Sequence, residues 1–256
     1  MFDLPHILYT VISFAITAVL LILCALFIKD NKSKKRILKI SALSTVILHY
    51  SSLYVDYFTT GSATVESVML LPIYPCNVAM WFLVAVAFMN EEKKFFKYLA
   101  EATFYLGLTG GIIGIVLNEN YMNTPSLADW DILKGLLSHS TMLFGCLYLL
   151  VGDYIKIRVS NLISVAGMLG FLLIDGITVI WLYRLFNLTP PNSMFLLGTP
   201  FPNLSWLNTW TVGLMAVAVC FVATALYEQI ALTKEERWYS KLKRYYKEQK
   251  YEKPLP

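Results

Sequence analysis

The distribution of lysine and arginine sorts the loops of this chain into two alternating sets. All but two of the 21 basic residues, Lys134 and Arg184, lie in the segments 29–39, 93–97, 156–158 and 234–253. The loops between these segments carry acidic residues instead, namely Glu66, Glu119, Asp129 and Asp131. Loops rich in Lys and Arg stay on the cytoplasmic side of a membrane. The alternation therefore predicts a multi-pass membrane protein.

Seven apolar runs separate these loops, at residues 5–28, 37–57, 70–89, 95–117, 133–151, 159–184 and 207–231. Each is close to the length that a helix needs to cross hydrocarbon. The predicted fold is all-α, with a seven-helix transmembrane domain over residues 1–232 and a basic tail over residues 233–256. With the basic loops inside, we expect the N-terminus outside, the C-terminus in the cytoplasm and the protein in the cell membrane.

The composition excludes several other classes of protein. The chain is 57% hydrophobic and only 15% charged, so an ordinary soluble domain is not expected. The net charge of +4 comes from one set of loops and does not indicate nucleic-acid binding. The four cysteines, Cys24, Cys76, Cys146 and Cys220, all lie in apolar runs. Their positions predict neither a disulfide framework nor a zinc site, and no cofactor is expected.

The tail and two loops have distinct compositions. The tail places Trp238, Leu242, Tyr245, Tyr246 and Gln249 on one side at helical spacing among basic residues, which predicts an interfacial helix on anionic inner-leaflet lipids. The loop 118–131 is expected to be solvated. The loop 187–206 has no charge and is rich in proline, so we expect it either to fold back over the outer mouth or to lie among headgroups.

The third apolar run opens with the sequence Leu-Leu-Pro-Ile-Tyr-Pro-Cys-Asn, residues 70–77. Proline removes a backbone donor and disturbs the preceding turn, so this helix should start late or be kinked. Cys76 beside such a break is either a reactive thiol or a small core residue.

Ionisable groups inside membrane spans are rare and usually functional. With a rise of about 1.5 Å per residue, Cys76 and His139 should lie about 9 Å below the outer surface, His49 about 12 Å and Asp175 about 13 Å. Four groups from four helices thus share one predicted layer. Three others lie apart from it: Asp56 at the outer rim, Glu101 nearer the cytoplasm, and His6 as a solvated interfacial residue.

A thiol and an imidazole at one depth suit nucleophilic catalysis, in which the histidine takes the thiol proton. Either Asp175 or His49 is expected to orient the base. Taken singly, each histidine is better explained by a helix-to-helix hydrogen bond. The glycines at 107, 110, 111 and 114 predict close approach of a neighbouring helix, and Cys146 shares the His139 face as a weaker thiol candidate.

Three short motifs together resemble the YwaF-like integral membrane family, which is related to vertebrate transmembrane acyltransferases of ether phospholipids. They are Pro75-Cys76-Asn77, Ser138-His139 and the segment Asn192-Ser193-Met194-Phe195-Leu196. The resemblance implies that Cys76 is the acyl-accepting nucleophile, that His139 is its base and that Asn192 belongs to the outer-loop motif. Three positions depart from the family pattern: Tyr74 replaces a histidine, Pro75 precedes the cysteine in place of a leucine, and Ser140 replaces a glycine.

We therefore expect a lipid acyltransferase or transacylase that forms a thioester on Cys76, with a membrane phospholipid or another acyl-lipid as substrate. Asn77 or Asn192 would stabilise the oxyanion, and Tyr74 would shape the pocket. The alternative is a transporter or small-ligand sensor that uses His49 and Asp175 at the same depth. A purely structural partner protein is a third possibility.

Overall fold

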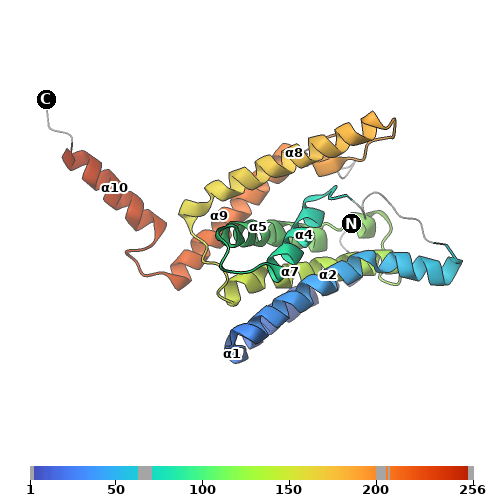
Figure 1. The fold of residues 1–256 in the computed structure, drawn as a ribbon, viewed down its shortest axis with the longest axis horizontal. Helices are drawn as coiled ribbons and strands as arrows, with labels where there is room; N and C mark the ends of the chain where they lie inside the picture. The colour runs from blue at the N-terminus through green and yellow to red at the C-terminus, as the bar shows by residue number, and fades with distance from the viewer. Residues whose placement is uncertain (1–2, 63–70, 200–205, 207, 253–256) are drawn as a thin grey trace.

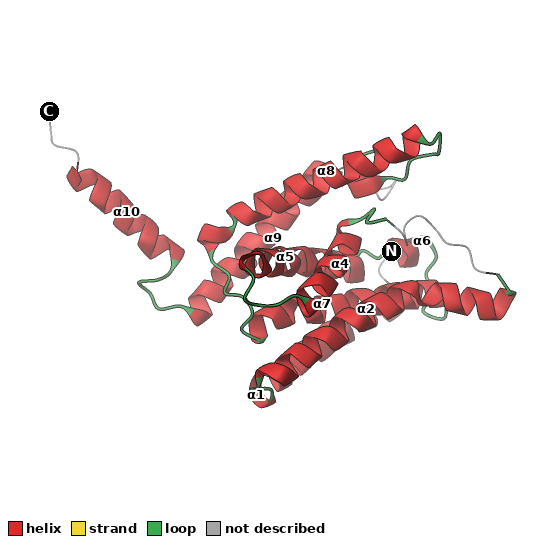
Figure 2. Cartoon of the chain, viewed as in Figure 1, coloured by secondary structure: helices red, strands yellow, loops and turns green. Residues whose placement is uncertain are grey.

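A computed structural model describes residues 3–62, 71–199, 206 and 208–252 of the protein, and these form helices joined by loops (Figure 2). Seven helices lie at the seven predicted apolar runs: α1 (Leu4–Phe27), α2 (Asn31–Thr60), α4 (Pro75–Phe88), α5 (Lys94–Val116), α7 (Trp130–Val151), α8 (Ile163–Leu185) and α9 (Thr209–Ala231). Three short pieces, α6 (Glu119–Asn123), η1 (Val159–Asn161) and η2 (Ser193–Phe195), lie in loops, and α10 (Trp238–Glu252) follows α9 (Figure 1). The predicted all-α class is confirmed for these residues.

Five helices in the described part of the chain are long and apolar enough to cross a membrane, namely α1, α5, α7, α8 and α9. The helix α4 has only 14 residues, or about 21 Å at the usual rise, which is less than the hydrocarbon thickness. It starts late, as the prolines predicted, because Pro75 occupies its first helical position. The helix α2 is long, but hydroxyl side chains such as Ser41, Thr45 and Ser52 make it less apolar.

The outer helices turn their polar residues inward and their apolar residues outward. In α1 the buried residues are His6, Ser13 and Thr17, whereas the exposed ones are aliphatic along the whole helix. In α9 a stripe of small and polar residues is buried, namely Ala216, Cys220, Thr224 and Glu228. This inversion of the water-soluble pattern fits helices whose outer faces contact lipid. The protein is a multi-pass helical membrane protein.

The helix α5 forms the centre of the core. Its middle residues are almost fully buried, among them Phe104, Tyr105 and Leu106, and α4 and α7 pack closely against it. The helix α2 covers α4 and α7 on one side, and α8 and α9 lie on the other side of α5 (Figure 1).

The basic loops meet at one end of the bundle, which we call the basic end. Lys34 at the start of α2 forms an ion pair with Asp153 after α7, with 3.0 Å between Nζ and Oδ2. Lys35 donates to the carbonyl oxygen of Met89 after α4, at 3.0 Å. The buried carboxylate of Glu228 in α9 accepts from the backbone N–H groups of Val159 at 2.8 Å and of Trp238 at 2.7 Å. Segments far apart in sequence but alike in charge are thus held together.

The structure of the opposite end of the bundle differs from one sequence prediction. His6 is fully buried: its Nε2 donates to the carbonyl of Ile115 at 2.9 Å, and its ring stacks on Tyr121 with centroids 4.6 Å apart. The prediction of a solvated His6 is therefore wrong. Most of the loop 118–131 is exposed or half-buried, as predicted, although Asn118 and Tyr121 within it are buried. The Tyr121 hydroxyl donates to Asp3 at 2.7 Å and lowers the pKa of that carboxyl group.

Candidate functional site

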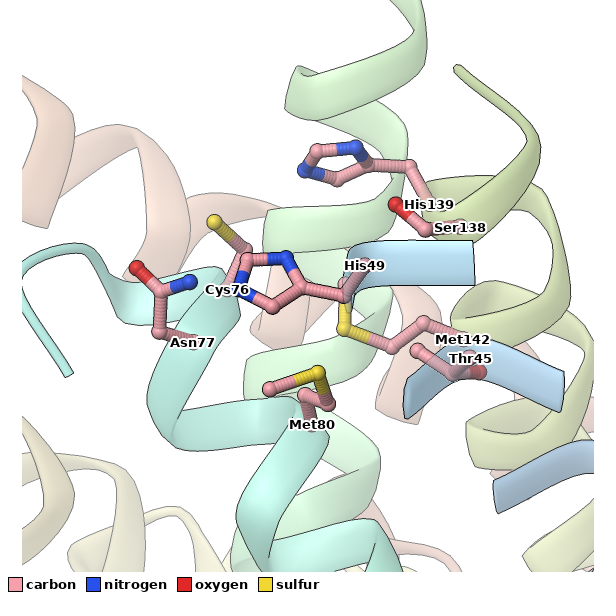
Figure 3. Close-up of a pocket in the computed structure, with 8 residues that line it drawn as sticks. All are labelled: Thr45, His49, Cys76, Asn77, Met80, Ser138, His139 and Met142. Atoms are coloured by element: carbon pink, nitrogen blue, oxygen red, sulfur yellow. The ribbon is translucent and has the colours of Figure 1, made fainter. Parts of the chain in front are cut away.

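A small cavity lies between α2, α4 and α7, with room for about one water molecule. Its lining residues are Thr45, His49, Cys76, Asn77, Met80, Ser138, His139 and Met142 (Figure 3). Three of the four groups predicted to share one layer, Cys76, His49 and His139, therefore face the same cavity. Depth along the helices could not decide this, because the sequence leaves helix rotation open.

Cys76 is the second residue of α4, where backbone N–H groups have no partner within the helix. The turn before it is fixed by Asn77, whose Oδ1 accepts from the backbone N–H of Tyr74 at 3.1 Å. This bond assigns the amide orientation, so that the Nδ2 donor of Asn77 lies on the side of Cys76 and His49 (Figure 3). The entry to α4 thus presents a thiol and an amide donor to one space.

The ring of His139 has a defined hydrogen position. Its Nδ1 lies 2.7 Å from the carbonyl oxygen of Gly135, one turn earlier in α7. A carbonyl only accepts, so Nδ1 carries the hydrogen and Nε2 of the neutral ring is left as the proton acceptor. Ser138 donates to the same carbonyl at 2.9 Å.

The residues that carry the thiol and the imidazole both pack against glycines of α5. A Cβ at Gly114 would overlap the His139 ring, and a Cβ at Gly110 would lie 3.5 Å from Cα and 3.6 Å from Cβ of Cys76. Gly110 and Gly114 are four residues apart, about 6 Å along the helix. Cys76 and His139 therefore pack on successive turns of one α5 face. The predicted close approach at these glycines is confirmed, and Gly107 and Gly111 receive Cys146 and Leu143 in the same way.

Three predicted site residues lie outside the cavity lining. Asp175 is on α8, and in the described part of the chain its buried Oδ2 has no hydrogen-bond partner. The observed partner of His139 Nδ1 is the Gly135 carbonyl, so neither Asp175 nor His49 orients this ring through Nδ1. Tyr74 stacks on Phe195, with ring centroids 5.5 Å apart. The amide of Asn192 is used in its own loop, where Oδ1 accepts from Leu197 N at 2.9 Å and Nδ2 donates to Gly198 O at 3.1 Å.

The loop that contains Asn192 packs against the turn that contains Tyr74. Met194 N and Ser193 Oγ both donate to the carbonyl of Ile73, at 2.9 and 3.1 Å. The segment 192–197 therefore folds back onto the turn that precedes Cys76, which favours the first of the two predictions for this loop. Pro200, Phe201 and Pro202, which were part of that prediction, lie outside the described residues.

Three lining residues were not named by sequence reasoning, namely Thr45, Met80 and Met142, and Ser138 was named only as part of the Ser138-His139 motif. A signal was present for these three, because Thr45, Met80 and Met142 lie three or four residues from His49, Cys76 and His139 on the same helix faces.

Ser140, which replaces the family glycine, joins α7 to α1 through hydrogen bonds with Tyr9 at 3.0 Å and with Ser13 at 2.7 Å. Within the described ranges, no three His, Cys, Asp or Glu residues are grouped so as to hold a metal ion.

The fold and the cavity together define a multi-pass helical membrane protein with a polar site enclosed between its helices. A family comparison matches residues 1–227, which is most of the chain, and the protein belongs to the TMEM164 family. No curated protein and no solved structure matches the chain at a significant level.

Proposed function

We propose that this protein is a membrane-embedded lipid acyltransferase of the Cys–His type, as its resemblance to the YwaF-like family implies. The observation that carries the proposal is that Cys76 and His139 line one cavity while the Gly135 carbonyl fixes the hydrogen of His139 on Nδ1. This leaves Nε2 available to take a proton.

In the first half-reaction the Cys76 sulfur attacks the ester carbonyl carbon of a phospholipid or another acyl-lipid, and the thiol proton passes to Nε2 of His139. The tetrahedral intermediate then expels the lysolipid oxygen, which takes that proton. The thioester that remains is attacked by the hydroxyl of a second lipid. His139 accepts the hydroxyl proton and returns it to the departing Cys76 sulfur.

Asn77 is the better supported of the two asparagines for stabilising the oxyanion. Its Oδ1 is occupied by the Tyr74 N–H, and its Nδ2 is on the cavity side (Figure 3). Both Oδ1 and Nδ2 of Asn192 form hydrogen bonds within its own loop. A preorganised amide donor beside the attacked carbonyl stabilises charge that develops only in the transition state.

The cavity has room for about one water and none for an acyl chain. The acyl chains must therefore remain in the bilayer beside the bundle, and both Cys76 and His139 are partly exposed. In the proposed topology all seven helices cross the cell membrane, with the N-terminus outside and the basic end in the cytoplasm. The shortness of α4 then places Cys76 below the outer surface.

The tail completes the proposed arrangement. In α10 the side chains of Leu242, Tyr245 and Tyr246 are exposed, beside a basic face, and α10 projects away from the bundle (Figure 1). We propose that it rests on anionic lipids of the inner leaflet. Charge-reversal of Lys243 and Arg244 should then weaken retention of the tail on vesicles that contain anionic lipid, with no effect in neutral vesicles.

The catalytic proposal is tested with purified protein in vesicles that contain a phospholipid with an alkyne-tagged acyl chain. The expected product is an adduct on the peptide that contains Cys76, released by neutral hydroxylamine. Cys76→Ala should remove the label and the transfer of acyl groups, whereas Cys146→Ala should retain both. Full turnover by Cys76→Ala would exclude the mechanism.

The same preparation tests the alternative of a transporter or small-ligand sensor. In that case uptake or ligand binding would be abolished by His49→Ala and left unchanged by Cys76→Ala, and no acyl adduct would form.

A further inference from the structure

An apolar groove lies between α8 and the loop that contains η2, on the end of the bundle opposite the basic end. It measures about 340 Å³ and is lined by Ile177, Ile180, Trp181, Arg184, Leu196 and Leu197. It shares no lining residue with the cavity at Cys76. It is therefore a separate site.

The walls of the groove are held in place by close packing. A Cβ at Gly176 would lie 2.7 Å from Leu196 Cδ1 and 2.9 Å from Met194 Cγ, so α8 and the loop are in direct contact at the residue that precedes Ile177. The Asn192 amide fixes the position of Leu197 through its backbone N–H. The groove is thus formed by a helix and a braced loop.

The charge at the rim of the groove is unusual for this end of the protein. Lys134 and Arg184 are its two basic residues in the described part of the chain. Lys134 is paired with Asp131, at 3.0 Å between Nζ and Oδ1, and it also donates to Ser52. Among the described residues, no hydrogen bond or ion pair engages the guanidinium group of Arg184. Arg184, whose charge has no partner among the described residues, therefore lines the same groove as the apolar side chains.

We propose that this groove binds a phospholipid, with the phosphodiester on the guanidinium of Arg184 and an acyl chain along Ile177, Ile180 and Leu196. Arginine binds phosphate oxygens through two parallel hydrogen bonds, and its charge complements the anionic group. Trp181 is half-exposed beside it and has the amphipathic ring that favours the headgroup level. The cation thus matches the phosphate, the interfacial aromatic residue matches the headgroup level, and the aliphatic part of the groove matches an acyl chain of one lipid molecule.

Binding at this groove is independent of acyl transfer at Cys76. The probe is a glycerophospholipid with a photoreactive diazirine in one acyl chain, incorporated into neutral detergent micelles with the full-length protein. Labelled peptides are mapped by mass spectrometry. A diacylglycerol with the same diazirine chain is the probe without phosphate. We expect the phospholipid probe to label residues 177–184 and 196–197 more strongly than the diacylglycerol probe does.

Arg184→Gln should reduce phospholipid labelling about ten-fold, to the level of diacylglycerol, as expected for loss of a charge-assisted hydrogen bond. Arg184→Lys should retain most of the labelling, and so should Arg158→Gln at the basic end. Cys76→Ala should label like the wild type, which separates this site from the catalytic proposal.

Three results would overturn the proposal. They are equal labelling by the two probes in the wild type, unchanged labelling in a folded Arg184→Gln or in the second variant Arg184→Glu, and displacement of the probe by inorganic phosphate instead of by unlabelled phospholipid. Labelled adducts that join two copies of the chain at this groove would assign it to self-association and would also exclude the lipid site.

Discussion

The carbonyl oxygen of Gly135 lies 2.7 Å from Nδ1 of His139 and accepts its hydrogen. The two residues are one turn apart in α7, so the bond is local to that helix and does not depend on a charged partner. It leaves Nε2 of His139 as the acceptor in the cavity that Cys76 lines. A backbone carbonyl thus supplies the orientation that the sequence had predicted for Asp175 or His49.

Replacement of His139 should slow formation of the acyl-enzyme. Loss of a general base typically costs a factor of about 10²–10⁴ in rate, so His139→Ala should lower the rate of labelling of Cys76 by that order. His49→Ala, in the same cavity, is the matched control and should cost less than about ten-fold, because His139 keeps its hydrogen bond. A larger loss in His49→Ala than in His139→Ala would reassign the base to His49.

The acceptor and donor roles of the Asn77 side chain can be tested separately. Asn77→Asp retains the Oδ1 acceptor for the Tyr74 N–H and loses the Nδ2 donor, whereas Asn77→Ala loses both. We expect both variants to lower the rate of transfer about 10²–10³-fold, the usual loss for one oxyanion donor. Only Asn77→Ala should also lower the free energy of unfolding, by about 1 kcal/mol for a lost helix cap.

The measurements for Asn77 are acyl transfer and unfolding in mixed detergent micelles. Asn192→Ala is the control for an asparagine outside the cavity. If Asn77→Asp transferred acyl groups at the wild-type rate, Asn77 would be a cap without a part in the chemistry.

A methyl group at Gly114 should displace His139, because the added Cβ would overlap the ring. Overpacking of this kind typically costs about 1–3 kcal/mol, so Gly114→Ala should lower both the unfolding free energy and the transfer rate. Gly167→Ala, where nothing lies within 4 Å, is the matched control. That change should be neutral or stabilising by up to about 1 kcal/mol, from helix propensity.

Gly110→Ala gives an internal comparison on the same face of α5. Its Cβ would make ordinary contacts with Cys76 at 3.5 to 3.7 Å, so a much smaller loss is expected. Equal losses in Gly110→Ala and Gly114→Ala would contradict the packing described for His139.

The hydroxyl of Ser140 should couple α1 to α7. It lies 2.7 Å from Ser13 Oγ and 3.0 Å from Tyr9 OH. A double-mutant cycle with Ser13→Ala and Ser140→Ala should give a coupling energy of about 0.6 kcal/mol, the average for such pairs within membranes. The cycle is measured by unfolding in mixed micelles. A coupling energy of zero would mean that α1 is held by its other contacts alone.

Loss of the Glu228 carboxylate should release the tail from the bundle. Glu228→Ala removes the acceptor for both Val159 N and Trp238 N, and a buried donor without a partner costs about 1–3 kcal/mol. We expect faster tryptic cleavage at Arg237 and a lower unfolding free energy. Glu235→Ala, at an exposed position in the same connection, should cleave at the wild-type rate, and equal rates in both variants would contradict the role of Glu228.

Much of the architecture was predictable because it depends on local composition. Apolar runs of span length and basic residues in alternate loops predicted helices at the seven observed places, and the contacts of Lys34, Lys35 and Glu228 bring the basic loops to one end. The late start of α4 followed from Pro75, since a proline fixes its own backbone angle and lacks a donor. These effects act within a few residues, so the chain order is sufficient to reveal them.

The composition of the site depended on helix rotation and on side-chain packing, which depth along a helix does not specify. Depth alone grouped Asp175 with Cys76 and His139, but Asp175 does not line their cavity, and burial of His6 follows from a contact with Ile115 more than a hundred residues away. The sequence by itself determined the helices, the polarity of their connecting loops and the presence of a thiol and an imidazole at one depth. Only the tertiary structure decided that these two groups line one cavity, because the glycine face of α5 lets α4 and α7 pack closely against it.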